Sequence, residues 1–291
     1  MRINYENSSG LLCVIGDPIG HSLSPLLQNT MLSELGEDYI YLAVHVKAEN
    51  LGDFVSAAKA IGIRGFNLTM PHKEHILPYL SAMTQEAQRC GSVNSVRILD
   101  GMLEGHSTDG IGFRRSLQDC GADFPGQIVT ILGAGGAAKS IAMTAVDSGA
   151  AKVIVANRTL EKAQTLCQGE AAMEAICLSD VAQALPQTDI LVSTLPVGMA
   201  GVGGSGIPDL SALKSGAVCM DCIYAPQLTP FMEEARRTGH RAYNGIGMLV
   251  YQAIYALEFF LGQTFDRETV SRLGNTLLEV SGVDPAGAAS K

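Results

Sequence analysis

The feature that most constrains the fold is the run QIVTILGAGGAAKSIAMTAVDSGAAKVIVANRT, residues 127–159. It holds a short apolar strand, a glycine turn, a segment of helix length and a second apolar strand. Gly133, Gly135 and Ala138 match G-x-G-x-x-G/A, where the glycines permit a tight turn and a close approach to pyrophosphate, and the small third residue permits close helix packing. The pattern alone also occurs in ordinary glycine-rich turns. The order of elements around it predicts a dinucleotide-binding unit.

The end of the second strand indicates which dinucleotide binds. An acidic residue there would hydrogen-bond the ribose of NAD, but the chain reads Asn157, Arg158, Thr159. A guanidinium suits a 2′-phosphate, and Thr159 and Lys162 add donors, so NADP is favoured over NAD. The alternative is a solvated surface arginine at the start of a helix.

The length of the chain and its alternation of elements predict two α/β domains. With 291 residues, 47% of them hydrophobic, the chain is long enough for two cores. Strand-like runs alternate with amphipathic, helix-length segments as far as about residue 260, a pattern typical of parallel α/β sheets. The glycine motif begins only after residue 126, which leaves room for a separate domain before it.

The charge of the chain disfavours polyanionic partners. Asp and Glu number 29 against 20 Lys and Arg, a net charge of −9, which repels nucleic acid and anionic membrane surfaces. The N-terminal residues lack a signal-peptide pattern, and the longest apolar stretch, near 248–262, is interrupted by Gln252 and Glu258. We expect a cytoplasmic protein without a nucleic-acid or membrane partner.

Neither the cysteines nor the histidines complete a metal site. The seven cysteines are scattered and odd in number, which favours reduced thiols. Cys219 and Cys222 have C-x-x-C spacing inside an apolar run, but no second pair follows, so we interpret them as core residues. His72 and His75 lack a completing ligand and are expected on a helix surface. No metal is predicted.

Polar residues interrupt the apolar segment GFNLTMPHKEHI, residues 65–76. Asn67, Thr69 and Lys73 stand where a core would exclude polar groups. Upstream, in IGDPIGHSLSPLLQN, Ser24 is expected to be the N-cap of a helix whose first residue is Pro25.

Two interpretations of the serines are open. Ser24 merely caps the helix, or Ser22 and Ser24 form a small carboxylate pocket beside the positive helix end. A third segment, CGSVNSVRILDGMLEGHSTDGIGF, predicts a β-hairpin followed by a turn that contains Asp109.

Taken together, these motifs occur in one order along the chain. They are IGxPxxHSxSP (15–25), GxNxTxPxK (65–73), VN (93–94), TDG (108–110), GAGGAA (133–138), NRT (157–159) and GIGMLVYQ (245–252). In this combination the chain resembles the shikimate dehydrogenase family over nearly its whole length. The resemblance implies reversible NADPH-dependent reduction of 3-dehydroshikimate to shikimate, a step of chorismate and aromatic amino acid biosynthesis.

The resemblance also implies roles for individual residues. Lys73 and Asp109 would be the catalytic pair, with Lys73 the proton-transfer group, and the Asp109 charge would raise the lysine pKa while desolvation would lower it. The substrate would be bound by Ser22 and Ser24 at its carboxylate, and also by Lys73, Asp109 and Tyr224. Four further residues would bind its ring hydroxyls or help to orient the catalytic pair: Asn67, Thr69, Asn94 and Gln252. The cofactor, NADP with NAD as the alternative, would be bound by Gly133, Ala134, Gly135, Gly136, Ala137, Asn157, Arg158, Thr159, Lys162, Thr194, Gly198, Met199, Gly245 and Met248.

The domain organisation implied by the resemblance has three parts. Residues 1–109 would form the substrate-binding domain, 110–244 an inserted Rossmann domain for NADP, and 245–291 helices returning to the substrate domain. The protein would be a monomer or homodimer.

Some positions depart from the family pattern. Gln28 stands where many relatives have His, Ser107 where Asn is common, and Asn244 where Asp is frequent. Gln28 is shared with some quinate/shikimate dehydrogenases, so an enzyme using NAD or both cofactors is an alternative, and Arg158 argues against it. A non-catalytic nicotinamide-binding sensor is a further alternative, against which the retained Lys73, Asp109 and Gln252 argue.

Overall fold

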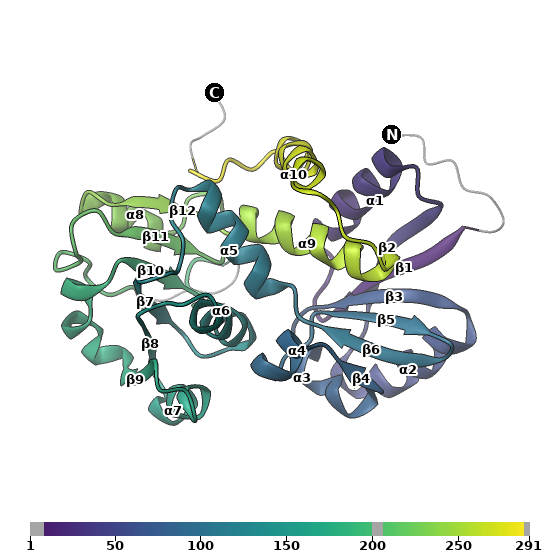
Figure 1. Cartoon of the computed structure of the whole chain (residues 1–291), viewed down its shortest axis with the longest axis horizontal. Helices are drawn as coiled ribbons and strands as arrows, with labels where there is room; N and C mark the ends of the chain where they lie inside the picture. The colour runs from purple at the N-terminus through teal and green to yellow at the C-terminus, as the bar shows by residue number, and fades with distance from the viewer. Residues whose placement is uncertain (1–8, 200–205, 288–291) are drawn as a thin grey trace. The chain divides into compact units, whose positions relative to one another are not determined.

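The computed structural model describes residues 9–199 and 206–287 and divides into two compact units (Figure 1). The first unit comprises Met1–Thr108 and Val250–Gly282, and the second comprises Asp109–Leu249 and Val283–Lys291. No helix among the described residues is both long enough and apolar enough to cross a bilayer.

The first unit is built on a six-stranded mixed sheet with the strand order β2-β1-β3-β5-β6-β4. Its strands are β1 (Gly10–Gly16), β2 (Tyr39–His45), β3 (Ile63–Leu68), β4 (Ala82–Met83), β5 (Ser95–Leu99) and β6 (Met102–His106). Its α-helices are α1 (Ser24–Leu35), α2 (Leu51–Ala60), α3 (His72–His75), α4 (Gln85–Cys90) and α10 (Arg267–Ser281), with most of α9 (Ile246–Leu261). The parallel strands β1 and β3 are apolar because side chains on both faces are buried, Phe66 among them.

The predicted hairpin is confirmed. Strands β5 and β6 pair antiparallel, and the two residues between them, Asp100 and Gly101, have φ values of 50° and 76°. Positive φ at both central positions is what a tight hairpin turn requires, and Asp-Gly adopts it readily. Asp109, however, does not lie in a turn after the hairpin but is the first residue of helix α5 (Asp109–Asp119).

The second unit is a six-stranded parallel sheet with the order β12-β11-β10-β7-β8-β9. Its strands are β7 (Ile128–Leu132), β8 (Lys152–Asn157), β9 (Met173–Cys177), β10 (Ile190–Ser193), β11 (Val218–Asp221) and β12 (Arg241–Tyr243). Its helices include α5, α6 (Gly136–Asp147), α7 (Leu160–Cys167) and α8 (Pro230–Arg237). Numbered from β7, this is the 3-2-1-4-5-6 order of a dinucleotide-binding fold, and the order reverses between β7 and β10. The predicted α/β class is confirmed.

Two local expectations are wrong. Ser24 is the first residue of α1 rather than its N-cap, because Leu23 has already turned into helical geometry (φ −79°, ψ −9°); the Ser24 amide donates to Ser22 Oγ at 3.2 Å. His72 is fully buried, not on a helix surface, and its Nε2 lies 2.7 Å from the carbonyl oxygen of Val46. His72 lies one helical turn before the core residue Ile76, the C-cap of this short helix, so the two point to the same side. His75 is exposed, as expected.

Candidate active site

A buried hydrogen-bond network in the first unit begins at Asn67, on β3. Tyr41, which has no exposed surface, donates from Oη to Asn67 Oδ1 at 2.6 Å. Asn67 Nδ2 in turn donates to the Asn94 carbonyl oxygen at 3.0 Å and to Ser95 Oγ at 2.8 Å. Both amide hydrogens of Asn67 are therefore engaged, and its oxygen is the atom with remaining capacity.

The network continues through Asn94 to the C-terminal part of the chain. Asn94 Nδ2 donates to Thr108 Oγ1 at 2.9 Å and to Gln252 Oε1 at 3.2 Å, and Asn94 Oδ1 accepts from the Thr108 amide at 2.9 Å. Thr108 Oγ1 also donates to the Gln252 carbonyl oxygen at 3.0 Å. Three residues expected to bind substrate, Asn67, Asn94 and Gln252, thus lie in one network, although Gln252 follows Asn94 by 158 positions.

The other polar residues expected in this unit lie at the ends of its elements. Thr69 follows β3, and its amide donates to the Ile15 carbonyl oxygen at 3.0 Å. Ser22 is half-buried before α1, and Ser24 is 9% exposed. Lys73, half-buried on α3, accepts the Val93 amide at its carbonyl oxygen at 2.9 Å.

Asp109 belongs to the second unit, where it opens α5 with 4% of its surface exposed. The first turn of a helix favours a carboxylate through the helix dipole. Close packing explains the glycine at the next position. A Cβ on Gly110 would lie 2.0 Å from Thr144 Oγ1 and 2.5 Å from the Ser140 carbonyl oxygen, both on α6. Helices α5 and α6 therefore pack so closely at Gly110 that no side chain fits between them.

The glycine turn between β7 and α6 has the geometry of an anion cradle. Gly133 has φ +111°, and a Cβ there would lie 2.3 Å from Thr194 Oγ1, so this position requires glycine. Gly135 precedes α6 without a side-chain cap, and a Cβ there would meet nothing within 4 Å. Gly135 thus borders open space at a helix N-terminus, which suits a pyrophosphate, and the half-buried Gly136 and Ala137 follow it in the first turn of α6.

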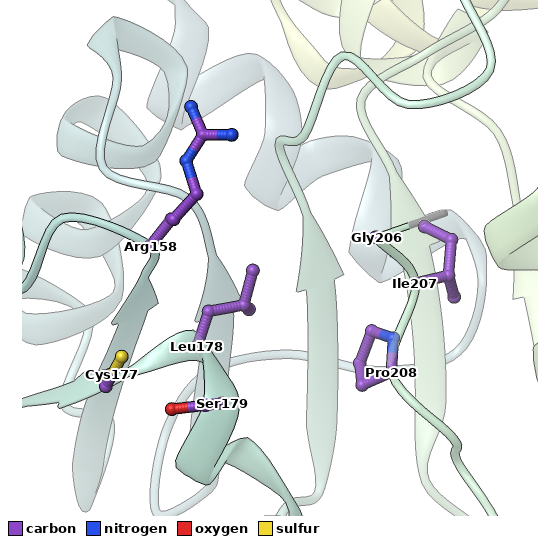
Figure 2. A pocket seen from close by; sticks show the side chains of 7 residues that line it. All are labelled: Arg158, Cys177, Leu178, Ser179, Gly206, Ile207 and Pro208. Carbon is purple, nitrogen blue, oxygen red and sulfur yellow. The ribbon is translucent and has the colours of Figure 1, made fainter. Parts of the chain in front are cut away.

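A cavity of about 410 Å³ opens beside Arg158 (Figure 2). It is lined by Arg158, Cys177, Leu178, Ser179, Gly206, Ile207 and Pro208. The sequence predicted Arg158 as a site residue but not the other six. Leu178 and Ser179 could have been predicted from their position, because they directly follow a strand of the parallel sheet. Lys162 is exposed and is not among the lining residues, and Asn157 Nδ2 donates to the Thr159 carbonyl oxygen at 2.8 Å.

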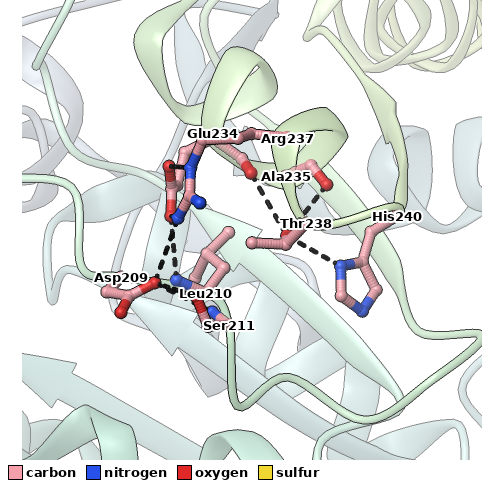
Figure 3. A network of polar contacts seen from close by, with 8 residues as sticks. All are labelled: Asp209, Leu210, Ser211, Glu234, Ala235, Arg237, Thr238 and His240. Carbon is pink, nitrogen blue, oxygen red and sulfur yellow. Dashed lines mark hydrogen bonds and ion pairs between the residues drawn. The ribbon is translucent and has the colours of Figure 1, made fainter.

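The chain that leaves this cavity is anchored to α8 (Figure 3). Arg237 pairs with Glu234 at 2.7 Å and with Asp209 at 3.2 Å, and the Leu210 amide donates to Glu234 Oε1 at 3.1 Å. Pro208, in the cavity wall, therefore directly precedes an anchored segment.

The remaining residues expected at the cofactor lie in the segment that follows β10 and at the start of α9. Thr194 Oγ1 donates to the Leu132 carbonyl oxygen at 2.8 Å, and Met199 is 45% exposed beside Gly198, whose φ is +102°. A Cβ on Gly245 would lie 2.2 Å from the Cys222 carbonyl oxygen, so the backbone here needs glycine. Met248 is 8% exposed on α9.

Tyr224 is half-buried in the loop after β11, and burial raises its pKa. Asp221, which sequence reasoning missed, holds both ends of this loop: its Oδ1 accepts from the Ile223 amide at 3.1 Å and its Oδ2 from Thr229 Oγ1 at 2.7 Å. Burial raises the pKa of Asp221 to about 6, partly offset by these hydrogen bonds. An acidic residue inside the apolar run AVCMDCI was the available signal.

Comparison with known proteins connects both units to one family. The family model described as shikimate dehydrogenase substrate binding domain matches residues 14–96, and the model described as shikimate / quinate 5-dehydrogenase matches residues 116–197. A curated shikimate dehydrogenase (NADP(+)) from Caldanaerobacter subterraneus is 38% identical over 92% of this chain and 97% of its own.

Solved structures of shikimate dehydrogenases are also similar to this chain. Shikimate dehydrogenase from Aquifex aeolicus has a TM-score of 0.84 at 31% identity, covering 93% of this chain and 99% of its own. Shikimate 5-dehydrogenase from Listeria monocytogenes, in complex with shikimate and NAD, also has a TM-score of 0.84 at 31% identity, covering 95% and 99%.

We expect the Tyr41 hydroxyl to stabilise the protein through its hydrogen bond to Asn67. Replacing Tyr41→Phe leaves the buried Asn67 oxygen without its donor and should lower the free energy of unfolding by about 1–3 kcal/mol, measured by urea denaturation. In an Asn67→Leu background the same change should cost less than half as much. Equal costs in both backgrounds would contradict this coupling.

Asp221 is expected to make stability depend on pH. Its folded pKa of about 6 lies above the ordinary 3.8, so the folded state binds the proton more tightly than the unfolded state. This tighter binding adds to the free energy of unfolding. The added stability is complete below pH 4 and is lost as the pH rises through 6, a change of about 3 kcal/mol. Asp221→Asn cannot titrate, so the free energy of unfolding of the wild type minus that of the variant should fall over this range. A pH-independent difference would show that Asp221 titrates normally.

Proposed function

Because this chain belongs to the shikimate dehydrogenase family, we propose that it catalyses the reversible NADP-dependent oxidation of shikimate to 3-dehydroshikimate, a step of chorismate and aromatic amino acid biosynthesis. The observation that carries the proposal is the 38% identity to an NADP-dependent relative over 92% of the chain. Lys73, Asp109 and the buried amide network supply the polar groups that the reaction needs.

The reaction removes two hydrogens from a ring alcohol. The hydrogen on carbon 3 leaves as a hydride, which NADP accepts when bound, and the hydroxyl hydrogen leaves as a proton. We assign that proton to Lys73 Nζ, with Asp109 as its coupled partner. In the reverse direction Lys73 returns the proton to the carbonyl oxygen.

Substrate binding is assigned to the first unit, with Asp109 and Tyr224 contributed by the second. Ser22 and Ser24 are proposed to bind the carboxylate, and Thr69, Asn67, Asn94 and Gln252 the ring hydroxyls. Since both hydrogens of the Asn67 amide are already donated, Asn67 is proposed to accept a hydrogen bond from a hydroxyl through Oδ1.

Cofactor binding is assigned to the second unit. The open helix start at Gly135 supports a pyrophosphate site, and the cavity beside Arg158 supports the adenosine end, where the guanidinium and Thr159 would hold the 2′-phosphate. Leu178, Ile207 and Pro208 add apolar walls to that cavity. Lys162 is proposed as an added cation, and Asn157 would support the turn. Thr194, Gly198, Met199, Gly245 and Met248 are proposed to face the nicotinamide.

A quinate/shikimate dehydrogenase is the second candidate, because the family model that matches residues 116–197 names both substrates. Gln28 contributes less to this alternative than its sequence position indicated. Its side chain is 1% exposed, and its Nε2 donates to the Ala253 carbonyl oxygen at 3.0 Å, an α1–α9 contact. We retain a monomer or homodimer in the cytoplasm as part of the proposal.

The purified protein should oxidise shikimate with NADP, measured as NADPH absorbance, much faster than it oxidises quinate with NAD. Lys73→Ala should lower kcat by about 10²–10⁴-fold with a smaller change in KM for shikimate, because the proton acceptor is lost. Lys59→Ala, an exposed lysine of the same unit, is the matched control and should retain wild-type kinetics. Wild-type turnover by the Lys73 variant would remove Lys73 from the mechanism.

Arg158→Ala tests the cofactor assignment. Loss of charge-assisted hydrogen bonds to the 2′-phosphate should weaken NADP binding by about ten- to a hundredfold, while NAD binding stays nearly constant. Arg64→Ala, an exposed arginine in the other unit, controls for net charge. The dissociation constants of both cofactors are measured by fluorescence titration. An equal loss of affinity for NADP and NAD would refute a phosphate-specific role of Arg158.

A further inference from the structure

The chain returns to the second unit after its last helix. Helix α10 belongs to the first unit, whereas the segment that follows it, residues 283–287, packs in the second. We call residues 283–287 the C-terminal strap. Hydrogen bonds join the strap to Asn244, to Arg236 on α8 and to Gln227, which lies in the loop of residues 222–229.

Asn244 is the residue that joins the strap to this loop. It is 1% exposed, and its Nδ2 donates to the Asp284 carbonyl oxygen at 2.8 Å and to the Gln227 carbonyl oxygen at 2.9 Å. Its backbone amide donates to the Pro285 carbonyl oxygen at 2.9 Å. Its Oδ1 accepts from the Ile246 amide at 3.1 Å, at the start of α9.

Further contacts keep the strap close to the loop. The Asp284 amide donates to Gln227 Oε1 at 3.3 Å, and the Arg236 guanidinium donates to the Ala286 carbonyl oxygen. Gly287 has φ +60°, and a Cβ there would lie 2.7 Å from the Gln227 carbonyl oxygen. The strap therefore passes Gln227 at a distance that only glycine permits.

The loop of residues 222–229 carries Tyr224 and contacts the strap at Gln227. Asp221 holds Ile223 and Thr229, at its two ends. Gln227, between Tyr224 and Thr229, is held instead by Asn244 and the strap. The middle of the loop is thus hydrogen-bonded to a segment more than fifty residues further along the chain.

We propose that Asn244 is a positioning residue, which fastens the C-terminal strap to the loop of residues 222–229 and thereby sets Tyr224 for substrate binding. The contacts made in this chain need an amide, because the side chain donates to two carbonyl oxygens while it accepts one amide hydrogen. A carboxylate of the same shape accepts only, and would place negative charge against both carbonyl oxygens. The effect on catalysis rests on the proposed function, whereas the fastening of the strap does not.

The test combines Asn244→Asp with a matched control, Asn29→Asp. Asn29 uses its amide in the same way in the first unit: Nδ2 donates to the Pro25 and Tyr41 carbonyl oxygens at 2.8 Å each, and Oδ1 accepts from the Tyr41 amide at 2.9 Å. Hydrogen exchange, followed by mass spectrometry on the full-length protein, should rise at least about tenfold in residues 222–229 and 283–287 of the Asn244 variant. The Asn29 variant should instead exchange faster around α1 and β2 only.

Kinetics provide the second measurement. Asn244→Asp should raise KM for shikimate by about three- to tenfold with kcat within about twofold of wild type, because the loop is misplaced and the chemistry is intact. A chain that ends at Gly282 lacks the strap and should show the same shift in KM. In that shortened chain Asn244→Asp should add a smaller shift than it causes in the full-length chain, because the Asp284 partner is already gone and, of the two donated contacts, only that with Gln227 remains. The shortened chain also keeps the test decisive if Asn244→Asp fails to fold.

The outcomes separate the two proposals. Unchanged exchange in the strap of Asn244→Asp would overturn the fastening role. Faster exchange in the strap alone, with residues 222–229 and KM unchanged, would overturn the link to Tyr224. If the wild type did not oxidise shikimate, the proposed function would fail, while the exchange results would still decide whether Asn244 fastens the strap.

Discussion

Buried amide groups that must find partners organise both units of this protein. Asn94 is 2% exposed, and its side-chain amide donates to Thr108 and Gln252, which reach it from other parts of the unit. An unpaired amide at such a depth would cost about 1–3 kcal/mol, so the network holds the hairpin, β3 and α9 in one arrangement. The polar surface proposed for shikimate is thus built on interactions that also stabilise the unit that bears it.

In the second unit the corresponding constraint is close backbone approach. Gly110, Gly133 and Gly245 each stand where a Cβ would lie within 2.3 Å of another atom, so helix α5, the β7–α6 turn and the start of α9 come nearer to their neighbours than side chains permit. Asp221 and Asn244 hydrogen-bond residues of the loop 222–229. Close packing and buried polar contacts together shape the region proposed for NADP.

Where local reasoning about the sequence was wrong, tertiary packing is the reason. His72 has a polar side chain in a short helix, which indicates a surface position, but the helix turns it toward Val46, whose carbonyl oxygen offers a partner. Ser24 has the residue type of an N-cap, yet Leu23 adopts helical geometry first. The residue type shows which groups need a hydrogen-bond partner. Which partner a buried group such as His72 finds is decided by elements distant in the sequence.

The sequence by itself determined the local features: the strand, turn, helix and strand order around Gly133, the Asp100–Gly101 hairpin turn, and the ordered motifs that identify the family. These depend on backbone preferences and on residues near one another in the chain, so they can be read directly. Only the tertiary structure decided that Tyr41 hydrogen-bonds Asn67, that Leu178 and Ile207 line the cavity beside Arg158, and that Asn244 holds residues 283–287. Burial creates these requirements, and a buried group takes whichever partner the folded chain brings within hydrogen-bond distance.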